Sequence, residues 1–123
     1  MASIAGTVVD VSPNGDGSCY QVIWTPVTSA DTPLPVSFPK HNDRSIQVAG
    51  TFDSSTTVVQ GSNDGTNYAG LFDPSSTAIS ITTAKIKAVL ENTVWIKPVV
   101  SGGGGSQSLT ISMLFHLGNP ART

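Results

Sequence analysis

The stretch from Val58 to Tyr68 constrains the fold most, because it reads as two strands joined by a tight turn. Its tip, Asn63-Asp64-Gly65, consists of residue types that tolerate a positive φ, as short hairpin loops require. Valines precede the tip and a tyrosine follows it, so apolar side chains flank a polar turn. The sequence therefore predicts a β-hairpin with strands over residues 56–62 and 66–72.

Two further segments alternate apolar and polar residues with a period of two, as half-buried strands do. The positions expected to face the core are Ile46, Val48, Gly50 and Phe52 in the first segment and Leu109, Ile111, Met113, Phe115 and Leu117 in the second. The segment from Cys19 to Val27 carries apolar residues on both faces and predicts another strand. Pro98 interrupts a strand expected over residues 94–101, which indicates an edge strand or a bulge.

One helix is expected over residues 84–92, where Ile86, Val89 and Leu90 have helical spacing and Thr82 or Thr83 can cap the first turn. Taken together, the pattern predicts an all-β fold. We expect a single β-sandwich or jelly-roll-like domain of about seven or eight antiparallel strands with one short helical turn. Residues 1–18 are interpreted as an extended N-terminal arm or a first edge strand, residues 19–118 as the sandwich, and residues 119–123 as a C-terminal tail.

Charge is scarce in this chain of 123 residues, of which 11% are charged, with a net charge of −2. The six cations form no cluster that could neutralise a phosphate backbone, so we expect no nucleic-acid partner. No apolar run approaches the roughly 18 residues that cross a bilayer, and the N-terminus lacks a signal-peptide pattern. We therefore expect that the chain is made in a cytosol and does not associate with a membrane. The single cysteine, Cys19, cannot form an internal disulfide.

Catalytic groups do not converge in the sequence. His41 and His116 are the two histidines, and no Gly-x-Ser-x-Gly nucleophile motif accompanies them. The aspartates mostly lie beside Gly, Pro, Asn or Ser, as turns require, and the loops at 14–18 and 63–67 lack the EF-hand pattern for calcium. Cys19 has no basic neighbour in sequence and is expected to be partly buried. We therefore predict no enzyme activity, no cofactor and no metal site.

Two segments are long, dotted with apolar residues and not needed for the sheets: the N-terminal 1–18 and the proline-containing 28–43. Such segments are often functional, and we expect both to reach neighbouring subunits. Trp95 has Val94 and Ile96 as neighbours, so it is expected to be exposed or at a contact if those two face the core. The predicted protein-contact residues are Ile4, Val8, Val9, Val11, Leu34, Val36, Phe38 and Trp95.

Three segments together resemble tailed-bacteriophage structural proteins. Residues 44–52, Arg-Ser-Ile-Gln-Val-Ala-Gly-Thr-Phe, are similar to a strand of the form R-S-[IV]-Q-V-x-G-T-F in that group. Residues 60–68 resemble the GSNDGTNW-like turn that follows it. Residues 95–103, Trp-Ile-Lys-Pro-Val-Val-Ser-Gly-Gly, resemble a later strand of the form [WYL]-[IV]-[RK]-P-V-V-[ST]-G-G. The resemblance covers residues 44–117.

This resemblance implies a small β-sandwich virion protein without catalytic residues. The expected role is a capsid decoration (cement) protein that lies over capsomer junctions and reinforces the shell. The implied partners are the major capsid protein of the same virion and further copies of the chain, with a trimer favoured, and the implied location is the capsid surface.

The same turn also resembles the SNDG hairpin of discoidin-like carbohydrate-binding domains. The chain lacks the pair of terminal cysteines and the arginine cluster of those domains. A carbohydrate-binding module, or a tail or fibre component used in host attachment, is therefore the alternative function, and a carbohydrate ligand is not favoured.

Overall fold

The computed structural model describes residues 2–12 and 15–117, which form eleven β-strands and no helix. The strands are β1 (Ala2–Ile4), β2 (Thr7–Asp10), β3 (Cys19–Val27), β4 (Asp31–Pro33), β5 (Asp43–Thr51), β6 (Ser55–Ser62), β7 (Ala69–Gly70), β8 (Ser80–Ile81), β9 (Lys85–Val89), β10 (Trp95–Gly102) and β11 (Ser108–His116). The predicted all-β class is confirmed, with more and shorter strands than expected. Within the described residues there is accordingly no helix that could cross a membrane. The predicted C-terminal tail, 119–123, lies outside the described residues.

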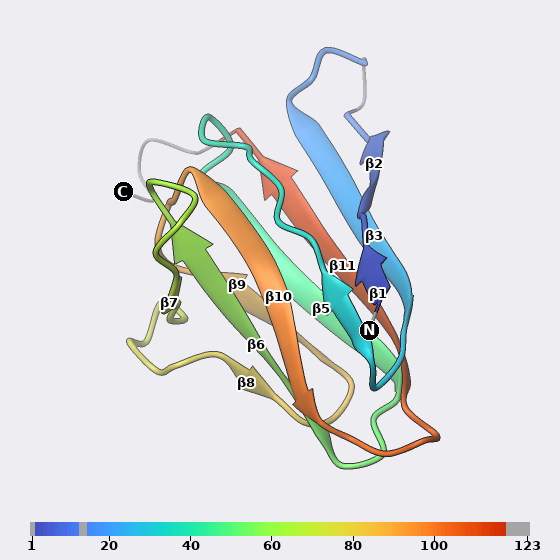
Figure 1. Ribbon diagram of the computed structural model, residues 1–123. Coiled ribbons are helices and arrows are strands. Elements are labelled where there is room, and N and C mark those ends of the chain that lie inside the picture. The colour runs from blue at the N-terminus through green and yellow to red at the C-terminus, as the bar shows by residue number, and fades with distance from the viewer. Residues whose placement is uncertain (1, 13–14, 118–123) are drawn as a thin grey trace.

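Two antiparallel sheets form the layers of a β-sandwich (Figure 1). The larger sheet has the strand order β2-β3-β11-β5-β9. The smaller sheet has the order β10-β6-β7, and β8 pairs with β6 beside β7. β10 is the last strand of its sheet, which confirms the edge position expected from Pro98, a residue that has no N–H to donate to a ladder.

The core lies between the two sheets and follows the period-two pattern of the long strands. In β5, Ile46 and Val48 are fully buried, and in β11 the same holds for Ile111, Met113 and Phe115. Leu117, the fifth residue expected inside, is 44% exposed because it lies beyond the end of β11. The alternation is therefore correct within the strand and fails at its end, where pairing stops.

The predicted helix over residues 84–92 is wrong. Residues 85–89 form β9, which pairs with β5 in the register Arg44↔Val89 to Val48↔Lys85. Only Val89 of the apolar residues with helical spacing is buried, whereas Ile86 and Leu90 are exposed. The exposed hydrogen-bonding edge of β5 offers these residues a ladder, and this tertiary pairing overrides a weak local preference for helix.

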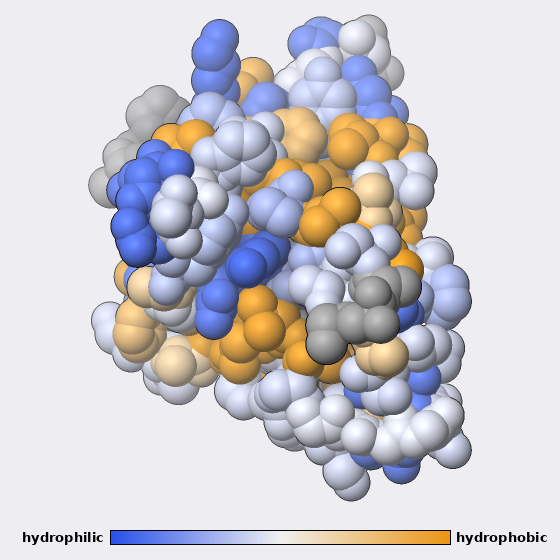
Figure 2. Space-filling view, in the orientation of Figure 1, coloured by the Kyte–Doolittle hydropathy of each residue, from blue (hydrophilic) through white to orange (hydrophobic). Residues whose placement is uncertain are grey.

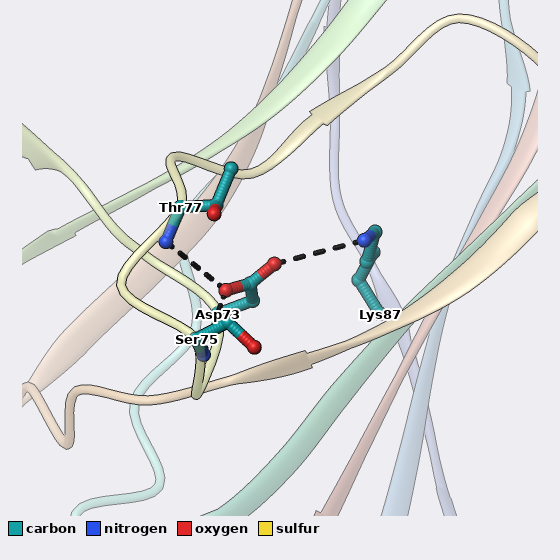
Figure 3. A network of polar contacts seen from close by, with 4 residues as sticks. All are labelled: Asp73, Ser75, Thr77 and Lys87. Atoms are coloured by element: carbon teal, nitrogen blue, oxygen red, sulfur yellow. Dashed lines mark hydrogen bonds and ion pairs between the residues drawn. The ribbon is translucent and has the colours of Figure 1, made fainter.

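A small polar network fastens β9 to the turn that precedes β8 (Figure 3). The carboxylate of Asp73 accepts hydrogen bonds from the backbone N–H groups of Ser75 and Thr77, at 2.9 and 3.1 Å. Its second oxygen lies 3.6 Å from the Lys87 ammonium in β9. These contacts, led by the Thr77 N–H, hold the pKa of Asp73 below its usual range.

The predicted hairpin at residues 56–72 forms with a much shorter second strand than expected. β6 ends at Ser62, but β7 comprises just Ala69–Gly70, which pair with Gly61 and Gln60. The connection is therefore a loop over residues 63–68 rather than the predicted three-residue tip, in which only Gly65 has a positive φ, +76°. Asp64 organises this loop, since its carboxylate accepts hydrogen bonds from the backbone N–H groups of Thr66 and Asn67, both at 2.8 Å.

Candidate interaction surface

The N-terminal segment and the proline-containing segment, which we expected to make contacts separately, lie side by side. β1 pairs in parallel with β4, in the register Ala2↔Asp31 to Ile4↔Pro33. The N–H of Leu34 donates to the Ile4 carbonyl at 2.8 Å, and the Leu34 carbonyl accepts from the Trp24 indole at 3.1 Å. In Figure 1 this pair lies between β10 and β3, across one open side of the sandwich.

β2 continues this surface onto the larger sheet as its edge strand. Thr7 to Asp10 pair with Ile23 to Tyr20 of β3. Between β1 and β2, Gly6 lies so close to β3 that a Cβ there would be 2.3 Å from Val22 Cγ1. Most of the predicted N-terminal arm is thus attached to the sandwich, in line with the alternative of a first edge strand.

The predicted contact residues fall into two groups. Ile4, Val36 and Phe38 are partly buried and pack against the core. Exposed side chains make up the second group, which contains Val8, Val9, Val11, Leu34 and Trp95. Apolar surface lies over β2 and β3 in the upper right of Figure 2, with polar side chains between it and the apolar surface over β6. These five exposed side chains run from β2, an edge strand of the larger sheet, to β10, an edge strand of the smaller sheet. We call them the rim surface.

Trp95 lies at the β10 end of the rim surface and is 37% exposed, while its neighbour Ile96 is fully buried and bridges to Val36. The alternation therefore placed these two side chains correctly. Further along the outer face of β10, the Lys97 ammonium lies 4.2 Å from the centre of the Tyr68 ring, a cation–π contact. A hollow of about 150 Å³ between β4 and β10 is lined by Lys97 on one side and Asp31 on the other.

Arg44 holds the proline-containing segment, residues 28–43, in place, a role that sequence reasoning missed. It is 1% exposed, and its guanidinium donates to the carbonyls of His41 and Phe38, both at 2.8 Å, and of Thr93 at 2.9 Å. It also lies 5.5 Å from the centre of the Phe115 ring. Burial without a carboxylate partner in the described residues lowers the pKa of Arg44 to about 10, so the group remains charged at neutral pH. Its period-two spacing from Ile46 and Val48 was the available signal that it faces inward.

Phe38 and His41 close the same end of the core. The Phe38 ring stacks on Phe115 with centroids 4.8 Å apart, and it contacts Tyr20 at 5.3 Å. His41 is buried and its Nε2 donates to the Gly17 carbonyl at 2.8 Å. The structure thus uses Phe38, a predicted contact residue, mainly to cover the core, and it gives His41 a structural partner.

The remaining titratable candidates do not assemble into a catalytic or metal-binding group. His116 is exposed at the end of β11, where its Nδ1 donates to the Leu117 carbonyl at 2.8 Å. Cys19 is buried, and desolvation raises the pKa of its thiol, which disfavours the nucleophilic thiolate. Within residues 2–12 and 15–117, no three His, Cys, Asp or Glu side chains are grouped so that they could hold a metal ion.

Comparisons with known proteins do not identify a family for this chain. No family model matches the chain, and no curated protein is similar to it. One matching solved structure is titled "Crystal Structure of FeII HppE", with 9% identity and a TM-score of 0.40. The match covers 89% of this chain and 56% of that one, and at this level of similarity it carries no argument about fold or activity.

Proposed function

We propose that this chain is a structural protein of a tailed-bacteriophage particle, a capsid decoration protein that binds the outer shell at capsomer junctions and stabilises it. The resemblance over residues 44–117 supports this proposal. The observation that carries it furthest is the rim surface, where β2, the 28–43 segment and the start of β10 expose apolar side chains. The partner is the major capsid protein of the same virion, and the location is the capsid surface.

The rim surface suits binding to protein rather than to a charged polymer. Val8 is 49% and Leu34 40% exposed, and both are held on backbone that is hydrogen-bonded to the sandwich. Apolar side chains on a rigid frame lose little conformational freedom on binding. Weak contacts of this kind, repeated over the symmetry copies of a shell, produce strong overall attachment through multivalency.

The experiment is co-sedimentation of the purified chain with shells assembled from the major capsid protein of the same phage. Wild-type chain is expected to pellet with shells in a saturable manner. Val8→Lys and Leu34→Lys should each weaken binding about tenfold or more, because each places a charge in an apolar contact. Ser80→Lys, at an exposed position of β8, is the matched control and should bind as the wild type does. Absence of saturable binding by the wild type would refute the proposal.

Point variants are preferred to deletion of residues 1–18. Deletion would remove β1 and β2 and uncover Val22 and Trp24, which are fully buried. A loss of binding could then reflect damage to the core. Single charged substitutions at exposed positions leave the strand pairing in place, so they test the surface itself.

A carbohydrate-binding module is the second candidate, and the exposed indole of Trp95 is the observation that favours it. Gly65 lies against this indole: a Cβ built on Gly65 would be only 3.1 Å from Trp95 Nε1. The loop over residues 63–68 therefore packs against one edge of the ring. An indole on a sheet face can stack on a sugar ring. Retention on a glycan array that Trp95→Ala abolishes, without any binding to shells, would favour this function over the first.

A further inference from the structure

The outer face of the larger sheet, turned away from the viewer in Figure 1, is uncovered by any described strand. The register places five side chains in each of two rows across β2, β3, β11, β5 and β9. The rows are Thr7, Ile23, Ser112, Gln47 and Ile86, and then Val9, Gln21, Leu114, Ser45 and Ala88. We call these ten residues the back face.

The back face is uncharged, and at its β9 edge an apolar side chain points to solvent while the charged ones point to the other face of the sheet. Antiparallel sheets normally turn polar side chains to solvent and apolar ones to the core. In β9 the register points Ile86 outward, 62% exposed, and turns Lys85 and Lys87 to the opposite face. Leu114 in the central strand is 40% exposed on the same outer face. Edge strands commonly carry lysine to prevent association, and here the lysines of the edge strand are directed away from the exposed face.

The back face carries both a hollow and exposed apolar side chains beside it. A hollow of about 210 Å³ opens in it, and Leu114 and Ile86 border this hollow from different strands. A two-fold axis would bring the projecting side chains of one copy over the hollow of the other. Isologous interfaces require such a pairing of a surface with itself.

The area also suits a second copy. Five strands about 4.8 Å apart, with about 3.3 Å per residue along the nine residues of β11, span at most roughly 700 Å². Specific interfaces bury about 1,200–2,000 Å² in total, or roughly 600–1,000 Å² per partner, so a face of this size falls at the lower end of that range. The ten residues of the back face carry no charge and can be dehydrated without leaving a charge unpaired, while Asp43 and His116 in the next row lie at its margin.

We propose that two copies of this chain pack their back faces against each other about a two-fold axis. The two larger sheets would then lie about 10 Å apart, as packed sheets do. The contact would cover Val9, which belongs to both surfaces, and it leaves Val8, Leu34 and Trp95 of the rim surface free. It generates a dimer or an even-numbered assembly, in place of the trimer that the resemblance favours.

Sedimentation equilibrium and light scattering of the full chain over a dilution series test this proposal. The wild-type mass is expected to approach twice the 12.7 kDa of one chain as concentration rises. Leu114→Lys should raise the dissociation constant at least about tenfold, because it buries a charge without a partner. Ile86→Lys is a second variant with the same expected effect. Circular dichroism and a thermal melt show that each variant is folded.

Leu34→Lys is the matched control, since Leu34 has the same 40% exposure as Leu114 but lies outside the back face. It should leave the mass of the dimer unchanged while weakening binding to shells. A wild type that stays monomeric at every concentration, or a trimeric mass, would overturn the proposal. So would folded Leu114→Lys and Ile86→Lys variants that associate like the wild type. These measurements contain no shells, so their failure is distinct from failure of the proposed function.

Discussion

Arg44→Met is the most informative substitution, because it removes the guanidinium that ties the 28–43 segment to Thr93, just before β10, while retaining the aliphatic stem. Methionine leaves the carbonyl oxygens of His41 and Thr93 without this donor, and the Phe38 carbonyl keeps only the His41 N–H, at 3.0 Å. Only the bond to His41 is fully buried, so its loss costs about 1–3 kcal/mol, and the two part-buried bonds cost roughly 0.5–1 kcal/mol each.

Part of this loss is offset, because the variant no longer buries a charge. The Nη1 of Arg44 has no hydrogen-bond partner, so its release returns about 1–2 kcal/mol. The net destabilisation is therefore about 2 kcal/mol, which lowers the melting temperature by roughly 6–10 °C for a domain of this size. Thermal unfolding by calorimetry, with denaturant unfolding as a second measure, determines both quantities.

Arg44→Lys separates charge from geometry. A lysine ammonium keeps the positive charge, but it is a compact donor that cannot reproduce the planar fork that reaches three carbonyls. We therefore expect Arg44→Lys to be at least as destabilised as Arg44→Met. A lysine variant with near wild-type stability, or a methionine variant that melts at or above the wild-type temperature, would refute the role assigned to the guanidinium.

The remaining predictions concern one carboxylate, one close approach and one ion pair. Four backbone and side-chain hydrogen bonds, led by the Asn67 N–H, hold the pKa of Asp64 well below its usual range. The ionised Asp64 carboxylate therefore stabilises the folded state fully above about pH 4, and this stabilisation declines as the pH falls further. The melting temperature of Asp64→Asn should accordingly depend less on pH in acid than that of the wild type. Gly6→Ala should cost about 1–3 kcal/mol, because its Cβ would overlap the Val22 side chain, and amide hydrogen exchange in β2 should quicken; unchanged exchange would contradict this. Lys87→Met should cost no more than about 1 kcal/mol, because its ion pair with Asp73 is partly exposed, and the difference in melting temperature should vanish at high salt.

The long strands could be predicted because their information is local. In β5 and β11 the period-two spacing of apolar residues decides which face is dehydrated, and a slip by one residue would expose the whole set. Pro98 likewise indicated an edge position from its own chemistry, since it has no N–H to donate. Five of the eight predicted contact residues are exposed.

Other features depend on partners that are distant in sequence. The side chain of Arg44 contacts a carbonyl 49 residues away, and β1 and β4 are three-residue strands with no periodicity to detect. Residues 85–89 have a spacing that is compatible with either a helix or a strand. The open edge of β5 decided between them, because a strand there satisfies backbone groups that a helix would leave unpaired.

Two apolar-faced β-layers with little charge follow from local sequence, because alternation and turn residues act within a few positions of each other. The tertiary structure alone decided which edges are closed, that the N-terminal and proline-containing segments form one surface, and that the back face remains open. These features arise from backbone pairing between distant segments, whose free energy exists only once both partners are in place.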